Sequence, residues 1–95
     1  MGLVEFDWDD LKEAANINKH GVDFWEAQTV FFDPLSVTLL DATDPSKEER
    51  FVTIGASAKS RLLLVVYAEK VEGVIRIISA RVPTSKERKT YEEGI

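Results

Sequence analysis

The side chains best suited to chemistry in this chain are cationic, and they fall in three short segments. Arginine binds a phosphate through two parallel hydrogen bonds, and an imidazole or a carboxylate beside it can move a proton. Together these residue types predict a site that binds and cleaves a phosphodiester. The segments are Lys19-His20-Gly21-Val22, Glu49-Arg50 and Arg76-Ile77-Ile78-Ser79-Ala80-Arg81.

Two residues are candidates for the proton transfer, and the sequence does not choose between them. His20 is the only histidine and lies in the last turn of a helix predicted over residues 10–20, where the helix dipole favours its charged form. Glu49 opens a predicted strand beside Arg50. The alternative interpretations are a histidine that only complements the dipole and a solvated strand end with a local ion pair.

Arg76 and Arg81 flank one apolar strand. Strand side chains alternate between faces, so residues five apart point to opposite faces unless a bulge intervenes or Arg81 lies past the last regular pair. We therefore expect the two arginines to act separately. Arg81, which precedes Pro83 by two positions, is the better candidate for chemistry, and Arg76 is expected to brace the opposite face.

Other catalytic templates find no match. The chain has no glycine-rich phosphate loop and no H-E-x-x-H motif, and Ser57, Ser60 and Ser79 have no neighbouring signal for a triad. With one histidine and no cysteine a transition-metal site is not expected, and the aspartates show no spacing typical of Mg²⁺ ligands. We expect no metal and no other cofactor.

The length and charge of the chain narrow the class further. Ninety-five residues predict one domain, over 1–95. The formal charge of −5 argues against an independent nucleic-acid-binding protein, although every arginine lies from position 50 onward. No secretion signal or membrane-spanning stretch is visible, so a cytoplasmic protein is expected.

The elements that must position these residues follow from periodicity and capping signals. We expect a strand over 3–8, a helix over 10–20 capped by Asp10 with Leu11, Ala14, Ala15 and Asn18 toward the core, and a second helix that Asp33-Pro34 stops. Strands follow over 36–42, 49–55, 62–67 and 74–82, with a turn over 43–46, and a helix runs over 85–93. The fold class is therefore α+β, an antiparallel sheet with helices on one face.

The ordered set of residues resembles the BrnT toxin family of bacterial type II toxin–antitoxin systems. The matching residues are Trp8-Asp9, Lys12, Asn16, Lys19-His20-Gly21-Val22, Phe24, Glu26-Ala27, Val30-Phe31, Asp33-Pro34, Glu49-Arg50, Gly55, Arg76-Ile77-Ile78-Ser79-Ala80-Arg81, Glu87-Arg88 and Tyr91-Glu92. Where such proteins commonly continue Arg-Ala, this chain has Val82-Pro83, which removes a cation.

The resemblance implies a RelE-like fold with the element order β-α-α-β-β-β-β-α and a ribonuclease activity. It implies a ribbon-helix-helix antitoxin of the BrnA kind as partner, with DNA contacted only through the complex. It also implies catalytic roles for His20, Glu49, Arg50 and Arg81 and substrate binding by Lys19, Arg76 and Tyr91.

Two functions follow as hypotheses. The first is a metal-independent endoribonuclease toxin whose products end in a 2′,3′-cyclic phosphate and whose antitoxin neutralises it. The second is a catalytically weak module that binds the antitoxin and acts as a co-repressor. The sparse apolar face of the last helix, which offers only Tyr91 and Ile95, supports the second hypothesis because such a helix would suit a docking partner.

Overall fold

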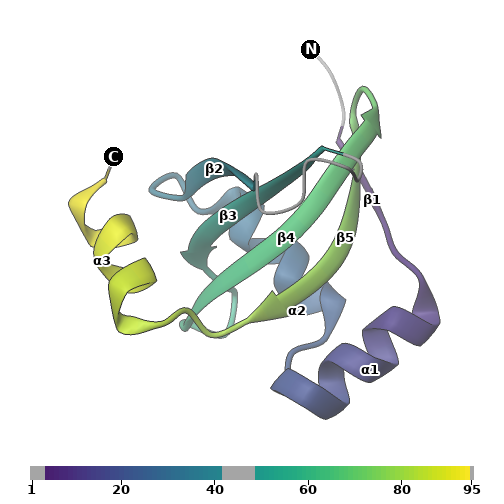
Figure 1. The fold of residues 1–95 in the computed structure, drawn as a ribbon, viewed down its shortest axis with the longest axis horizontal. Helices are drawn as coiled ribbons and strands as arrows, with labels where there is room; N and C mark the ends of the chain where they lie inside the picture. The colour runs from purple at the N-terminus through teal and green to yellow at the C-terminus, as the bar shows by residue number, and fades with distance from the viewer. Residues whose placement is uncertain (1–3, 42–48, 95) are drawn as a thin grey trace.

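A computed structural model describes residues 4–41 and 49–94 and shows three helices, a 3₁₀ turn and a five-stranded sheet (Figure 1). The strands lie in the order β1-β5-β4-β3-β2. The elements are β1 (Glu5–Asp7), α1 (Asp10–His20), α2 (Phe24–Thr29), η1 (Val30–Phe32), β2 (Val37–Asp41), β3 (Arg50–Ala56), β4 (Leu62–Val71), β5 (Val74–Arg81) and α3 (Ser85–Glu93).

The α+β prediction and its element order are confirmed. Strands β2 to β5 form an antiparallel meander, while β1 pairs in parallel with β5 from Glu5 opposite Val74 to Asp7 opposite Arg76. The sheet is therefore mixed, because β1 pairs in parallel with the edge of β5 that β4 does not occupy. The predicted turn over 43–46 lies outside the described residues.

The core lies between the α2–η1 segment and one face of the sheet, which we call the helix face. Phe24, Ala27 and Val30 of α2 and η1 pack there against residues of the central strands that include Leu63 and Val65. The continuous apolar run of β4 is thus a central strand, as expected from its sequence. Among the described residues, the other face, which we call the open face, is bordered by α3 at one end (Figure 1).

Helix α1 packs differently from its prediction. Its cap is Asp9, whose carboxylate accepts from the backbone N–H groups of Leu11 and Lys12, and not Asp10. The residues expected toward the core, Leu11, Ala14, Ala15 and Asn18, are exposed, and Asn16 is the buried one.

Asn16 is buried because the edge of β5 needs a hydrogen-bonding partner. Strand β1 covers β5 only from Val74 to Arg76. Further along, the Asn16 side chain donates to the carbonyls of Ala80 and Val22, each at 2.9 Å, and accepts from the Ala80 N–H at 3.0 Å. A polar residue therefore takes the place of the apolar contact that helical periodicity predicted.

Helix α3 begins and ends where the sequence predicts. Thr84 and Glu87 form the expected capping box, and Gly94 ends the helix with a φ of 68°. No residue of α3 is buried, which agrees with its sparse apolar face. The helix must therefore be held by polar contacts.

Candidate functional site

Arg76 and Arg81 lie on the same face of the sheet, so the prediction that they point to opposite faces is wrong. The register of β5 against β4 shifts between Val66 and Tyr67: Ser79 pairs with Val66 but Ile77 pairs with Tyr67. Ile78 is the extra residue of a bulge, which restores the same side for residues five apart. Both arginines therefore belong to the open face.

The two arginines are nevertheless far apart along the direction of the strands. Arg81 pairs with Leu64 and Arg76 with Ala68. Four residues of extended strand span about 13 Å, so the two side chains flank different parts of the face.

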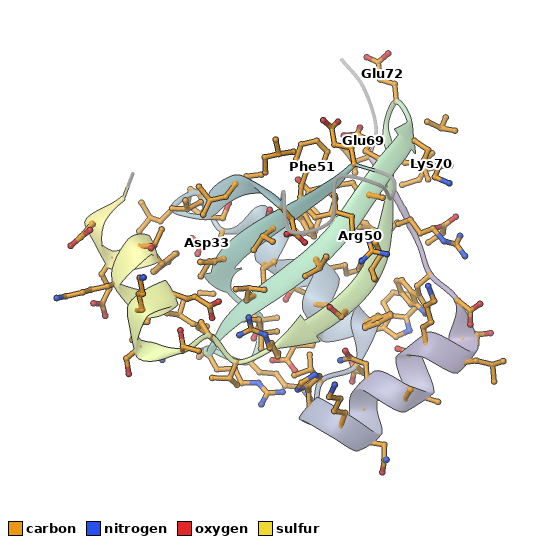
Figure 2. The ribbon with its side chains drawn as sticks, in the orientation of Figure 1. Asp33, Arg50, Phe51, Glu69, Lys70 and Glu72 are labelled. Atoms are coloured by element: carbon orange, nitrogen blue, oxygen red, sulfur yellow. The ribbon has the colours of Figure 1, made fainter. Side chains whose placement is uncertain are left out.

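Arg50 joins Arg76 at the same end of the open face. It directly precedes Phe51, which pairs with Tyr67 and packs on the helix face, so alternation places Arg50 on the opposite side, near Ala68. Figure 2 shows its side chain over the sheet. The Nε atom of Arg50 is buried and has no hydrogen-bond partner among residues 4–41 and 49–94. A buried donor of this kind is costly unless something accepts its hydrogen.

Arg76 is held loosely. Its one ion pair within the described structure is a 3.2 Å contact to Asp7, and both side chains are about half exposed, at 51% and 52%. The two residues line a pocket of about 190 Å³ with Ala68, Lys70 and Val74. Arg50 and Arg76 therefore lie on the same face, on either side of Ala68, at the end where β5 begins, and we call these two residues the arginine pair.

Arg81 is held firmly instead. Its guanidinium donates to both carboxylate oxygens of Glu87, at 2.8 and 3.0 Å. This hydrogen bonding lowers the pKa of Glu87 to about 2 and raises the pKa of Arg81. The two residues border a groove of about 400 Å³ whose other lining includes Val52, Ile54 and Leu64. Arg81 thus attaches α3 to the open face.

A second tightly held arginine, Arg61, was not predicted from the sequence. Its Nε and Nη2 atoms donate to the buried carboxylate of Glu26 at 2.8 and 2.7 Å, and Ser57 donates to the same carboxylate at 2.7 Å. Hydrogen bonds from Arg61 lower the pKa of Glu26, and the pair raises the pKa of Arg61. Ser57 and Arg61 lie 31 and 35 positions after Glu26, so no local motif could reveal the network.

His20 and Lys19 lie far from the arginine pair. They end α1 just before Gly21, whose carbonyl accepts from Arg61 at 3.2 Å. This contact places them near the start of β4, whereas Arg50 lies near Ala68. Six residues of β4 separate these points, or about 20 Å. Glu49, exposed and directly before β3, stays beside Arg50. The predicted site is therefore divided between two ends of the sheet.

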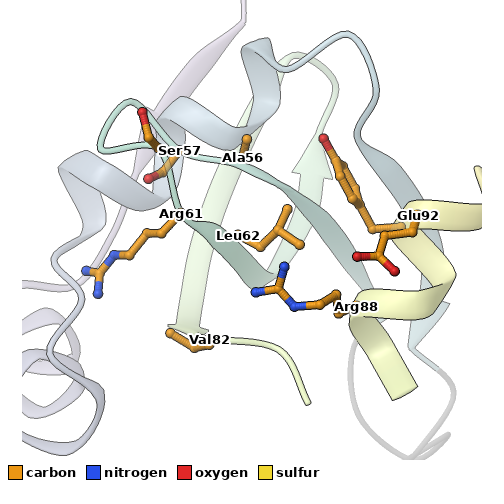
Figure 3. A pocket seen from close by; sticks show the side chains of 9 residues that line it. Ala56, Ser57, Arg61, Leu62, Val82, Arg88 and Glu92 are labelled. Carbon is orange, nitrogen blue, oxygen red and sulfur yellow. The ribbon is translucent and has the colours of Figure 1, made fainter. Parts of the chain in front are cut away.

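Tyr91 fastens α3 from the other side. Its hydroxyl donates to Asp33 at 2.7 Å, and Asp33 also accepts from the backbone N–H groups of Ala56 and Leu35. These bonds lower the pKa of Asp33, the Ala56 bond contributing most, and the contact raises the pKa of Tyr91. Tyr91 also lines a cavity of about 590 Å³ between α3 and the β3–β4 turn (Figure 3).

The described part of the chain contains neither a membrane-spanning helix nor a cluster of metal ligands. No helix there is long and apolar enough to cross a membrane. No group of three or more histidine and acidic side chains in residues 4–41 and 49–94 is placed to hold a metal ion.

These features define a small α+β protein with three arginines on its open sheet face and a polar C-terminal helix at its border. Residues 8–87 match the family described as "Ribonuclease toxin, BrnT, of type II toxin-antitoxin system", and the chain belongs to this family. Its members are ribonuclease toxins, and a type II system implies an antitoxin as partner.

A solved structure supports the fold assignment. The crystal structure of the Brucella abortus ribonuclease toxin BrnT matches with a TM-score of 0.67 and 21% identity, over 86% of this chain and 99% of that one. This likeness concerns the fold. No curated protein matches this chain.

Proposed function

We propose that this protein cleaves RNA on the open face, with the arginine pair binding the reacting phosphodiester. Membership of a ribonuclease toxin family supports the reaction class. The observation that carries the location is the buried, unpartnered Nε of Arg50 beside the loosely held Arg76. A phosphate oxygen would accept from that donor and complete its hydrogen bonding.

The proposed reaction needs no metal. The 2′-hydroxyl attacks the adjacent phosphorus in line while Glu49 takes its proton. The bond from phosphorus to the 5′-oxygen then breaks, and solvent protonates the departing oxygen. Arg50 stabilises the charge that builds on the phosphorane-like transition state. The products are a 2′,3′-cyclic phosphate and a 5′-hydroxyl.

Glu49 is the general base in this proposal because of its position. It precedes Arg50 directly, whereas His20 lies about 20 Å away along the sheet. One group cannot serve both ends, so the two candidates define two different active sites. With Glu49 as base, Lys19 and His20 lie outside the reaction, and Arg81 stays paired with Glu87.

Single-turnover cleavage of a short RNA by Glu49→Gln and His20→Gln variants tests this choice. We expect Glu49→Gln to lose about 100-fold in rate and to lose the rise of rate with pH on the acidic side. His20→Gln should stay within about threefold of wild type. The opposite result would move the reaction to the α1 end. Loss of cleavage in EDTA, or products with a linear 3′-phosphate from the first step, would contradict the metal-independent mechanism.

For the partner, we propose a ribbon-helix-helix antitoxin of the BrnA kind that supplies all DNA contacts. The net charge of −5 suits a subunit that does not bind DNA itself. Trp25, Phe32 and Leu35 are at least two-thirds exposed, which suits a protein contact. The toxin alone should leave operator DNA unshifted and the complex should shift it. A shift by the toxin alone would contradict this division.

One observation favours a second function, a co-repressor with little catalysis. Both terminal nitrogens of Arg81 donate to Glu87, so one of the four predicted catalytic residues is already paired. Induced expression without the partner separates the two functions. Growth arrest with RNA decay supports the enzyme, and normal growth with tight antitoxin binding supports the co-repressor.

A further inference from the structure

We propose that the cavity between α3 and the β3–β4 turn binds a guanine base of the RNA. This inference rests on the proposed function, because it places a second nucleotide of the substrate beyond the arginine pair. The cavity has a volume of about 590 Å³ and contacts Arg88, Tyr91 and Glu92 of α3, whereas the groove that Arg81 borders contacts Glu87 and Thr90. It is lined by Ala56, Ser57, Ser60, Arg61, Leu62, Val82, Arg88, Tyr91 and Glu92.

The lining suits a flat, neutral group with polar edges. Ala56, Leu62 and Val82 provide apolar surface for a ring face. The charges of the lining balance, because Arg61 is neutralised by the buried Glu26 and Arg88 is matched by Glu92. A phosphate would need a net positive site, whereas unpaired RNA bases are recognised by stacking and by hydrogen bonds to their edges.

Arg88 and Glu92 are the groups that read the base edge. They are four residues apart on α3 and therefore share one side of the helix. Figure 3 shows Arg88 reaching toward Leu62 with the Glu92 carboxylate beside it. Neither forms an ion pair with another described residue. Arg61 points away from them in the same view and is already held by Glu26.

Guanine is the base that complements this pair best. Its O6 and N7 atoms accept from a guanidinium, the commonest specific contact to that base. Its N1–H and N2–H groups both donate along one edge, which matches the two oxygens of a carboxylate. Adenine and cytosine offer a carboxylate only an exocyclic amine, and uracil offers it one ring N–H. The cavity should therefore prefer guanine and disfavour uracil most.

Nearby backbone geometry supports a binding role for this corner. Ser60, which lines the cavity, has a φ of 64°, and it is the one non-glycine residue with a positive φ in the described structure. The β3–β4 turn is closed by hydrogen bonds from Ser57 N–H to Arg61 and from Ser60 N–H to Ser57. Backbone held in a sparsely populated conformation is concentrated at functional sites.

Direct binding tests the proposal independently of catalysis. We expect guanosine 5′-monophosphate, titrated into ¹⁵N-labelled protein, to shift the amide signals of residues 57–61 and 88–92, and uridine 5′-monophosphate to leave them unchanged. Glu92→Gln should weaken guanosine monophosphate binding about tenfold. Glu93→Gln, the neighbouring carboxylate that does not line the cavity, is the matched control and should bind as wild type does.

Cleavage gives a second readout. In RNAs that differ at one position, replacing guanine by inosine, which lacks the N2 amine, should slow cleavage in wild type and not in Glu92→Gln. Absence of guanosine-specific shifts at these amides overturns the inference, whether or not RNA is cleaved. Cleavage with the same base preference in wild type and in Glu92→Gln also overturns the inference. Guanosine binding here without any RNA cleavage would instead overturn the proposed function and leave the base site standing.

Discussion

Two pairs of arginines on the same small sheet are held in opposite ways. Arg61 and Arg81 each donate twice to one carboxylate at 2.7 to 3.0 Å. Arg76 has a single 3.2 Å contact to Asp7, and Arg50 keeps a buried Nε without a partner in the described part of the chain. The first pair joins elements of the fold, whereas the second has hydrogen bonds left to give to a ligand.

This difference distinguishes arginines that stabilise the fold from arginines that can bind a ligand. The sequence alone does not make this distinction. A guanidinium that is fully paired contributes stability and would have to break those bonds to bind phosphate. One that is under-satisfied costs stability until a ligand arrives. Substitution should therefore affect folding at Arg61 and Arg81 and activity at Arg50 and Arg76.

The largest expected effect is on catalysis, at Arg50. Arg50→Ala should lower the single-turnover rate of RNA cleavage about 100-fold, because removing one donor to a transition-state oxyanion costs this much. Its free energy of unfolding should change by less than about 1 kcal/mol, since a buried unpartnered donor is removed. Arg50→Lys keeps the charge and should retain part of the rate. A fully active Arg50→Ala variant would contradict the functional role that the comparison assigns to Arg50.

The next effect is on stability, at Arg61. Arg61→Met leaves the carboxylate of Glu26 buried without its cation, and we expect the free energy of unfolding in urea to fall by about 2 kcal/mol. This is below the usual range because the Arg61 side chain is 39% exposed. The double variant Glu26→Leu, Arg61→Met removes both charges and should recover most of the loss. Wild-type stability in Arg61→Met would show that the pair is not structural.

The sequence predicted the elements of the fold well, for identifiable reasons. Capping signals and periodicity placed α3 within its observed bounds, and the apolar run from Leu62 marked the central strand. The bulge at Ile78 could not be predicted, because it depends on how β5 is registered against β4. It decided the face on which Arg76 lies.

The site was harder to predict than the fold because its contacts are long-range. Asn16 is a polar residue of a helix, which would ordinarily be expected at the surface. It is buried because the backbone groups of Ala80, at the edge of β5, need hydrogen-bonding partners. His20 and Arg50 both carry suitable chemistry, but only the sheet order shows that they lie at different ends. Charge alone does not reveal which arginine is already paired.

A smaller effect is expected from pH at the Arg81–Glu87 pair. Glu87 has a folded pKa of about 2 against an ordinary value of 4.5, so its contribution is present above pH 4.5 and is lost as pH falls toward 2. Because Arg81 is 37% exposed, we expect this contribution to be only about 1 kcal/mol. Glu87→Gln should lower stability by that amount at pH 7 and by only a small fraction of it at pH 2. Unfolding curves at several pH values measure it, and an equal loss at both would contradict the ion pair.

The smallest expected effect is at Tyr91, and it tests whether this contact of α3 is structural or functional. Tyr91→Phe removes one hydrogen bond to Asp33, which keeps its bonds from Ala56 and Leu35, so stability should fall by only about 0.5 kcal/mol. If Tyr91 only fastens α3, the cleavage rate on RNA should stay within about twofold of wild type. A tenfold loss of rate with unchanged stability would bring Tyr91 into the reaction. The reacting phosphodiester itself would then have to lie under α3, away from the arginine pair.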